Sequence, residues 1–225
     1  AIRSFCRLTG TAHPEVFHTN EGHAGFLGIE RIRELTVGEG GPHLDFDTAL
    51  EVSRAGTVFT THTPVPAGID RFPRELVSQY FGGNSPTPGV PVERVLALGA
   101  EDYDGGDAGV FNMAVMGFRL AQRANGVSEL HGHVSRGMFN GLWPAFDEAE
   151  VPITSITNGV HGPTWIAPEM MAFGNWVGGA ESVENGEGWE QGRDAEIWSV
   201  KRQLRQRLVD EARRRLRASW RDRGA

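Results

Sequence analysis

The chain has 225 residues, 39% of them hydrophobic and 23% charged, and its formal net charge is −7. This mildly acidic, mixed-charge composition argues against a nucleic-acid-binding surface and is typical of a cytoplasmic protein that handles solutes. No apolar run approaches the ~20 residues that a membrane-spanning helix needs, so we expect no membrane partner. The single cysteine, Cys6, excludes a disulfide framework and a thiolate metal site, and it favours a reducing compartment.

The chain opens with alternating strand and helix patterns. Residues 15–19 are a short, apolar-rich strand candidate, and Asn20 can cap a helix over residues 24–35. A second helix, capped by Asp45 or Asp47, leads to the next strand. This order of strand, helix and strand predicts a parallel sheet in an α/β fold.

The next strand, residues 57–61, is the most informative segment of the sequence. It carries β-branched and aromatic residues, runs into His62, and then meets Pro64, Pro66 and Gly68, which end both strand and helix. In open α/β sheets, ligands bind in the crevice beyond the carboxyl ends of the strands. We therefore expect His62 to lie where chemistry takes place.

The middle of the chain predicts helices over residues 74–81 and 92–98, followed by an acidic segment, residues 101–107. That segment lacks the terminal glutamate of a calcium-binding loop, so we interpret it as a solvated loop and expect no metal site. Residues 111–142 predict two segments folded against the sheet, the second a helix over residues 127–139.

Two histidines, His131 and His133, fall on this second helix. They are two residues apart and therefore point to different faces of the helix. We expect one of them to be packed and the other solvated, rather than a metal-binding pair.

A third strand candidate, residues 151–156, also runs into a polar glycine loop, which contains Asn158 and His161. Residues 164–176 predict a buried helix. Residues 178–192, rich in Gly and Glu, are expected to be a linker, and residues 194–222 a long helix with one apolar stripe and an arginine-rich, solvated face.

Three predicted strands thus deliver a histidine just past their carboxyl ends: His23, His62 and His161. Histidines at equivalent ends of one sheet converge on a common crevice, whereas a single loop histidine is usually structural. Glu21 and Asn158 add groups that pair with hydroxyls. The sequence contains no dinucleotide-binding fingerprint, phosphate-binding P-loop or nucleophile elbow, and its histidine spacings fit no zinc pattern. The residues alone therefore predict one polar-ligand-binding half of an α/β protein, and a sugar would suit it.

Several blocks of the sequence, in order, resemble the α-glucan phosphorylases, specifically the shorter bacterial type. The likeness covers about residues 15–215, and the blocks are residues 20–24, 60–68, 70–73, 111–114, 125–131 and 156–161. The resemblance implies a Rossmann-like half of a two-domain, GT-B-like glycosyltransferase that acts on an α-1,4-glucan and inorganic phosphate and yields α-glucose 1-phosphate. It also implies pyridoxal 5′-phosphate as cofactor, which acts through its phosphate group.

The resemblance assigns roles to particular residues. In the family, the histidine that matches His62 is catalytic: its ring contacts a sugar hydroxyl, and its carbonyl faces the anomeric carbon. Glu21 and His23 match residues on the side of the glucan acceptor, and we count Asn158 and His161 with them as substrate-binding residues. The family's glycine-rich loop lies before this chain and its cofactor-binding lysine after it, so no cofactor-binding residue is expected here.

The resemblance also sets the expected domain organisation. Residues 1–192 would be the second part of an amino-terminal glucan-binding domain, and residues 193–225 a helix leading into a cofactor-binding domain. The apolar stripe of that helix would pack on the further domain or pair with a neighbouring chain, as in a homo-oligomer. Two other hypotheses stay open: a non-catalytic sugar-binding module, and half of a nucleotide-sugar glycosyltransferase.

Overall fold

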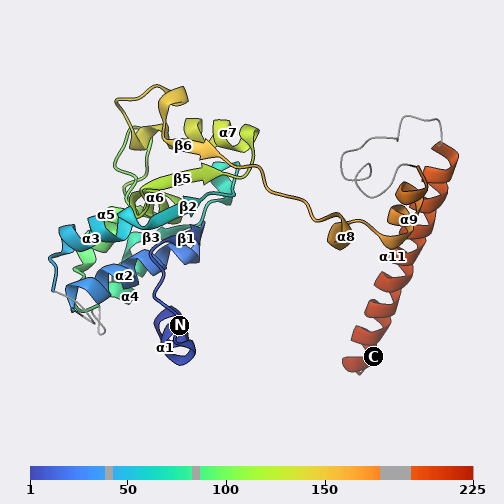
Figure 1. Cartoon of the computed structure of the whole chain (residues 1–225), viewed down its shortest axis with the longest axis horizontal. Helices are drawn as coiled ribbons and strands as arrows, with labels where there is room; N and C mark the ends of the chain where they lie inside the picture. The colour runs from blue at the N-terminus through green and yellow to red at the C-terminus, as the bar shows by residue number, and fades with distance from the viewer. Residues whose placement is uncertain (39–42, 83–86, 178–193, 225) are drawn as a thin grey trace. The chain divides into compact units, whose positions relative to one another are not determined.

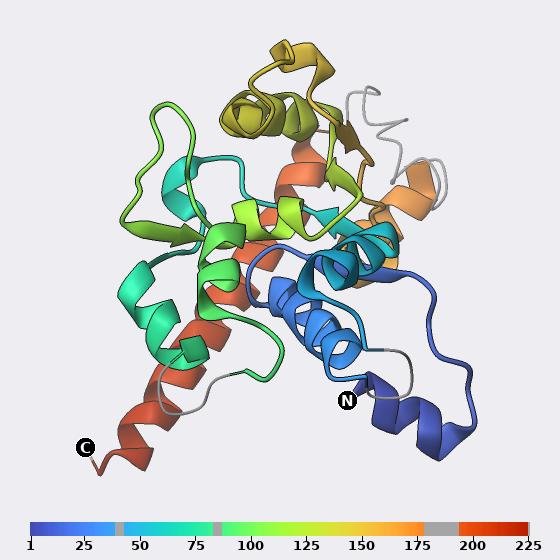
Figure 2. The same cartoon turned by 90° about the vertical axis from the view of Figure 1, so that its left-hand side faces the viewer.

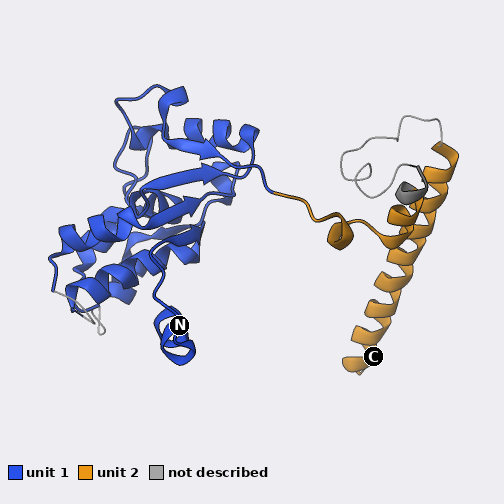
Figure 3. Cartoon of the chain, in the orientation of Figure 1, with its two compact units in different colours: residues 1–158 blue, residues 159–225 orange. Residues whose placement is uncertain are grey.

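The computed structural model describes residues 1–38, 43–82, 87–177 and 194–224. The chain divides into two compact units, Ala1–Asn158 and Gly159–Ala225 (Figure 3). The predicted domain boundary after residue 192 falls within residues 178–193, which the structure does not describe. It therefore stays a prediction. The predicted linker over residues 178–192 also lies outside the described residues.

A four-stranded parallel sheet forms the centre of the first unit (Figure 1). Its strands, in the order in which they lie side by side, are β1 (Phe17–Asn20), β2 (Thr57–Thr60), β5 (Arg123–Gly126) and β6 (Ile153–Ser155). Asn20 aligns with Thr60, and Thr60 aligns with Asn125. The predicted α/β fold with a parallel sheet is confirmed, and the carboxyl ends of all four strands lie along one edge.

The remaining elements of this unit connect and cover the strands. They are α1 (Ile2–Thr9), η1 (His23–Gly25), α2 (Phe26–Thr36), α3 (Phe46–Ala55), η2 (Pro66–Gly68), β3 (Arg71–Pro73), α4 (Arg74–Gly82), α5 (Val92–Leu98), β4 (Val110–Asn112), α6 (Met113–Arg119), α7 (Glu129–Phe139), η3 (Asn140–Leu142) and η4 (Glu148–Glu150). Figure 2 shows α2 and α3 side by side. Short strands β3 and β4 pair antiparallel, apart from the main sheet.

Two clusters of buried side chains hold the unit together. One joins α2, α3, α4, α5 and α6, with Ile32, Phe111 and Met116 fully buried in it. The other packs α6 and α7 on one face of the sheet, where Phe59 meets Phe118 edge to face at 4.9 Å between ring centroids. Gly117 permits this contact, because a Cβ at that position would collide with the Phe59 ring. Packing of apolar helix faces on the sheet supplies most of the stability of such a layer.

Several local predictions are wrong, and each has a physical reason. Asn20 does not cap a helix: the 3-10 helix η1 begins after Gly22, and the Asn20 side chain contacts His62 instead. Strand β5 was not predicted because Ala124, Asn125 and Gly126 are poor strand formers; it forms nonetheless because it pairs with two neighbouring strands. The acidic segment is only partly solvated, since Glu101 is 6% exposed.

The second unit contains α8 (Gly162–Trp165), α9 (Pro168–Val177) and α11 (Asp194–Asp222). The single buried helix expected over residues 164–176 is therefore wrong: the segment forms two helices, and Trp165 is 78% exposed. Arg207 of α11 pairs with Glu169 of α9. The bounds of the long helix match the prediction, no described residue of it is buried, and Leu208, Leu216 and Trp220 of its apolar stripe are exposed. What covers that stripe stays a prediction.

Candidate functional site

The ends of β1 and β2 bring Glu21 next to His62. The two strands are adjacent and parallel, and the Glu21 amide continues the ladder by donating to the Thr60 carbonyl at 3.0 Å. The two segments that follow β1 and β2 then leave the sheet at the same edge. Gly22 follows with φ +88°, a conformation that favours glycine, and a Cβ there would lie 3.3 Å from the Asp70 carboxylate. The glycine therefore lets the Glu21 segment turn tightly against the loop that carries His62.

One oxygen of the Glu21 carboxylate binds three consecutive residues of that loop. Oε2 accepts from the His62 amide at 2.7 Å, from the Thr63 amide at 3.0 Å and from the Thr61 hydroxyl at 2.8 Å. Burial alone would raise the pKa of the half-buried Glu21 carboxyl, but hydrogen bonds from His62, Thr61 and Thr63 outweigh it and lower the pKa. Glu21 is therefore ionised at neutral pH and anchors the loop.

This anchor fixes the direction of the His62 carbonyl. The His62 carbonyl and the Thr63 N–H belong to one planar peptide group, and none of the peptide bonds that the structure describes is cis. Because the Thr63 N–H points at Glu21, the His62 carbonyl points away from it. Glu21 thus sets the direction of the His62 carbonyl dipole, just beyond the end of β2, by binding the backbone directly.

The His62 imidazole is exposed and is oriented by Asn20. Its Nε2 lies 3.1 Å from the Asn20 side-chain oxygen, which can only accept, so Nε2 carries the proton in this contact. In the neutral ring, Nδ1 is then left as an acceptor for a donor such as a hydroxyl. Sequence reasoning missed this role of Asn20, because it depends on the register of β1 against β2, which aligns Asn20 with Thr60.

The other predicted site residues lie in different places. His23 is exposed in η1, two residues beyond Glu21 and thus at the same edge of the sheet. Asn158 is exposed beyond the end of β6, where its amide donates to the Val127 carbonyl at 3.1 Å. His161 belongs to the second unit, where its Nδ1 lies 2.6 Å from the Thr164 hydroxyl. The structure therefore brings Glu21, His23 and His62 to one edge, whereas convergence of His161 with them stays a prediction.

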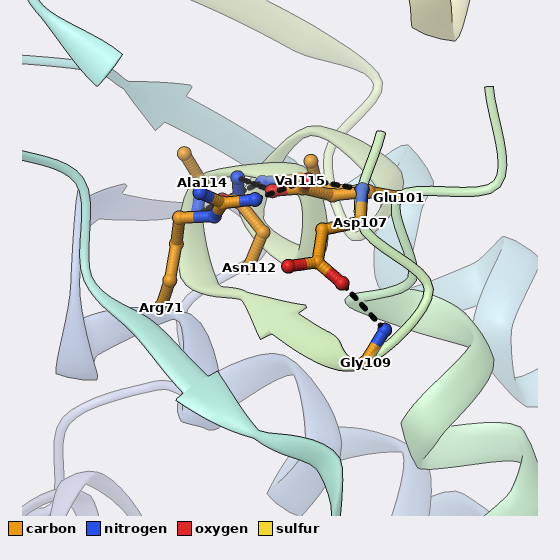
Figure 4. Close-up of polar contacts among 7 residues, drawn as sticks. All are labelled: Arg71, Glu101, Asp107, Gly109, Asn112, Ala114 and Val115. Carbon is orange, nitrogen blue, oxygen red and sulfur yellow. Dashed lines mark hydrogen bonds and ion pairs between the residues drawn. The ribbon is translucent and has the colours of Figure 1, made fainter. Parts of the chain in front are cut away.

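An ion pair between the exposed Arg71 and the buried Glu101 holds the far end of the His62 loop (Figure 4). Glu101 accepts from the Arg71 guanidinium at 2.6 Å, from the Asn112 side chain at 2.8 Å and from the Asp107 amide at 3.0 Å. Burial opposes ionisation of Glu101, but the contacts with Asn112, Asp107 and Arg71 prevail and lower its pKa. Arg71 directly follows Asp70, whose carbonyl accepts from the Met113 amide at 3.0 Å. The loop is thus fixed at both ends.

The residues of this chain do not fit a cofactor bound as a Schiff base. The one lysine of the sequence, Lys201, lies on α11, where its ammonium group sits 4.9 Å from the centre of the Trp198 ring.

Among the described residues, no group of three or more His, Cys, Asp or Glu side chains is arranged to hold a metal ion. In the same part of the chain, no helix combines the length and apolar character required to cross a membrane.

The sequence of the chain is similar to those of known proteins. No protein-family model matches the chain. The chain is 56% identical, over its whole length, to glycogen phosphorylase from Mycobacterium tuberculosis, of which it covers 26%. It is 35% identical to maltodextrin phosphorylase from Thermococcus litoralis, with 90% of the chain and 24% of that protein aligned. Glycogen phosphorylase from Aquifex aeolicus is 33% identical over 91% of the chain and 29% of its own length.

The chain therefore spans about a quarter of the length of the curated relatives that it matches. The likeness includes every block that suggested the family from the sequence, since it extends over the whole chain. The two names, glycogen and maltodextrin phosphorylase, describe the same type of enzyme with different glucans. The chain belongs to the α-glucan phosphorylase family.

Proposed function

We propose that the complete protein transfers the terminal glucosyl unit of an α-1,4-glucan to inorganic phosphate, and that this chain supplies the edge that faces the glucosyl unit. The observation that carries this proposal is the Glu21 carboxylate bound to the peptide that contains the His62 carbonyl. Family membership supports the reaction type. The fold supports a Rossmann-like half of a two-domain, GT-B-like enzyme, since the strand ends form an open edge.

The reaction requires electrostatic help at the anomeric carbon. The bond from C1 to the glycosidic oxygen breaks, a phosphate oxygen forms a new bond to C1, and the departing glucan O4 takes a proton. Positive charge develops on C1 as the old bond lengthens, and a fixed carbonyl oxygen facing it lowers the barrier. In our proposal the His62 carbonyl does this, because Glu21 holds its peptide before the substrate arrives.

Hydroxyl recognition falls to the exposed polar groups at the same edge. We assign Nδ1 of His62 as acceptor for a sugar hydroxyl, because Asn20 occupies Nε2. His23, Asn158 and His161 are proposed as further hydroxyl partners, and Glu21 acts on the substrate through the loop that it anchors. His62 is the catalytic residue in this assignment.

The cofactor and the phosphate site belong to parts of the protein outside this chain. Pyridoxal 5′-phosphate, proposed from the family, would supply a phosphate group that takes part in proton transfer; Lys201 is not placed to hold it. The proposal includes a cytoplasmic location, with the apolar stripe of α11 packed on the cofactor domain or on a second copy in a homo-oligomer.

The test compares His62→Ala with His133→Ala in the complete gene product. His133 is also an exposed histidine, but it lies on α7. We expect His62→Ala, which removes the ring but keeps the backbone carbonyl, to lower glucose 1-phosphate release from maltodextrin by at least about tenfold, the size of one lost hydrogen bond to a sugar hydroxyl. The melting temperature should not change, because a loop residue contributes little to the core. His133→Ala should change neither.

Equal losses of activity and melting temperature in His62→Ala would assign His62 a structural role instead. Sugar binding by the complete protein without glucose 1-phosphate release would indicate a non-catalytic binding module. Transfer of glucose from a nucleotide sugar to a glucan hydroxyl, with release of the nucleotide, would indicate the other class of glycosyltransferase. The isolated chain should release no glucose 1-phosphate, because the proposed cofactor and phosphate groups lie elsewhere.

A further inference from the structure

His131 is a buried histidine whose two ring nitrogens both face protein groups. It lies in the first turns of α7 and is 7% exposed. Its Nδ1 accepts from the Val127 amide at 3.1 Å, and its Nε2 lies 3.5 Å from the hydroxyl of the fully buried Ser135. Because Nδ1 accepts, the neutral ring carries its proton on Nε2. A buried ring with both nitrogens directed at the protein is not available to a sugar.

His131 holds the peptide group between Gly126 and Val127, and the next peptide group, between Val127 and Ser128, holds Asn158. The Val127 amide points at the His131 ring, and the Val127 carbonyl accepts from the Asn158 amide at 3.1 Å. The preceding carbonyl, of Gly126, accepts from the Ile156 amide at 3.0 Å. The chain that leaves β6 is therefore fastened, through the amides of Ile156 and Asn158, to two successive peptide groups at the end of β5.

The local sequence makes room for the ring. A Cβ on Gly126 would lie 2.8 Å from His131 Nδ1 and 2.9 Å from the Gly132 amide nitrogen, so the ring approaches the backbone where only glycine leaves space. The His131 amide is itself held by the Ser128 side chain at 3.1 Å, which caps α7. Glycine, cap and ring form one arrangement at the carboxyl end of β5.

We propose that His131 is a positioning residue for Asn158. Its ring holds the peptide group between Gly126 and Val127, whose carbonyl binds the Ile156 amide. This fixes the orientation of the next peptide group, whose Val127 carbonyl binds the Asn158 amide. His131 thereby sets the backbone of Asn158 and so the place from which the Asn158 amide side chain meets the sugar. The inference rests on the proposed function only for the role of Asn158 as a sugar ligand. The positioning itself is a property of the backbone and has its own readout.

The experiment uses four variants of the complete gene product: His131→Ala, His131→Asn, His131→Gln and, as matched control on the same helix, His133→Ala. The Asn side-chain oxygen occupies the same place along the side chain as Nδ1 and can accept from Val127, whereas the Gln oxygen lies one bond further out. We expect His131→Ala and His131→Gln to lower kcat/KM for maltodextrin by about tenfold. The kcat/KM of His131→Asn should stay within about threefold of the wild-type value, and that of His133→Ala should equal the wild-type value.

Backbone hydrogen exchange supplies the direct readout. We expect the amides of Val127 and Asn158 to exchange about five- to tenfold faster in His131→Ala and His131→Gln, with His131→Asn restoring protection. The Val127 amide loses and regains its bond to the side chain of residue 131, and the Asn158 amide is bound to the segment that this bond holds. The Met113 amide, bonded to the Asp70 carbonyl, is the internal control. Unchanged exchange at Asn158 in His131→Ala, or equally fast exchange at Met113, would overturn the proposal.

A fifth variant, Asn158→Ala, separates this inference from the proposed function. If exchange at Asn158 depends on His131 as expected but Asn158→Ala keeps full activity, the positioning stands and the sugar role of Asn158 is wrong. If Asn158→Ala lowers activity while the His131 variants leave exchange unchanged, the sugar role stands and the positioning is wrong.

Discussion

Two carboxylates hold the two ends of the loop that carries His62, and they do so in different ways. Glu21 binds the beginning of the loop through backbone amides and a hydroxyl, all of them neutral donors. Glu101 binds the end of the loop through the guanidinium of Arg71, together with an amide and the Asn112 side chain. Both carboxyls have a lowered pKa despite burial, so both are ionised at neutral pH.

Because their contacts differ, we expect the two carboxylates to affect different properties of the protein. Glu101 is 6% exposed and ties the loop end to the β3–β4 pair, so its loss leaves buried polar groups without partners. Glu21 is half-buried, and of the three residues that it binds only Thr61 is buried, whereas His62 is exposed and Thr63 partly exposed. We infer that Glu101 contributes mainly to folding, and Glu21 mainly to the geometry of the His62 peptide.

Glu101→Ala is expected to have the largest effect. It removes the partner of Arg71 and leaves the buried Asn112 side chain without one of its acceptors. We expect the β3–β4 region to lose about 2 kcal/mol of stability, because the buried Asn112 side chain loses its acceptor, whereas water can reach the exposed Arg71. The measure is hydrogen exchange at the Asn112 amide, which is bonded to the Gly99 carbonyl. A loss of activity at unchanged exchange would show that Glu101 acts like Glu21.

Glu21→Ala is the counterpart on the other end of the loop. We expect kcat for glucose 1-phosphate release to fall about 100-fold, because a shift of the His62 carbonyl of about 1 Å has effects of that size. The melting temperature should change little. Glu21→Gln keeps one oxygen acceptor and should fall between Ala and the wild type. If Glu21→Ala instead raises KM alone, Glu21 is a direct ligand of the glucan acceptor.

Because of both carboxylates, the folding stability of the protein should fall at acidic pH. Their folded-state pKa values lie below the ordinary value of 4.5. The unfolded chain therefore binds protons at a pH where the folded chain does not, so their contribution is complete above about pH 4.5 and is lost as pH falls through the lowered values. We expect the denaturant midpoint to fall between about pH 5 and pH 3, and to fall less in Glu101→Gln. An equal slope in that variant would exclude Glu101 as a source.

The sequence predicts one part of this site and not the other. The apolar strand before His62 and the prolines after it place that histidine at a strand end, and the structure shows β2 ending at Thr60. The partnership of Glu21 with that loop depends on the register of β1 against β2, which no local pattern in the chain reveals. Likewise, Asn20 fits a helix cap by residue type, but the nearby His62 ring takes its side chain instead.

Glu101 illustrates the same limit from the other direction. Its neighbours Asp102 and Asp104 are exposed, so a run of acidic residues correctly suggests a solvated loop. The exception arises because Arg71 and Asn112, distant in sequence, meet at the β3–β4 pair and give one carboxylate a buried partner. Composition reports the average character of such a segment, and tertiary pairing decides the single residue.

Asp45→Ala has the smallest expected effect and serves as the control carboxylate. Asp45 caps α3 by accepting from the Thr48 amide at 3.0 Å and from the Thr48 hydroxyl at 2.6 Å, and these bonds lower its pKa. It is therefore a hydrogen-bonded carboxylate like Glu21, but it holds a helix end instead of the His62 loop. We expect the melting temperature to fall by about 2 °C, as for the loss of an ordinary cap, with kcat/KM unchanged. A fall in kcat/KM like that of Glu21→Ala would mean that the activity responds to any loosened carboxylate contact, and the special role of Glu21 would be lost.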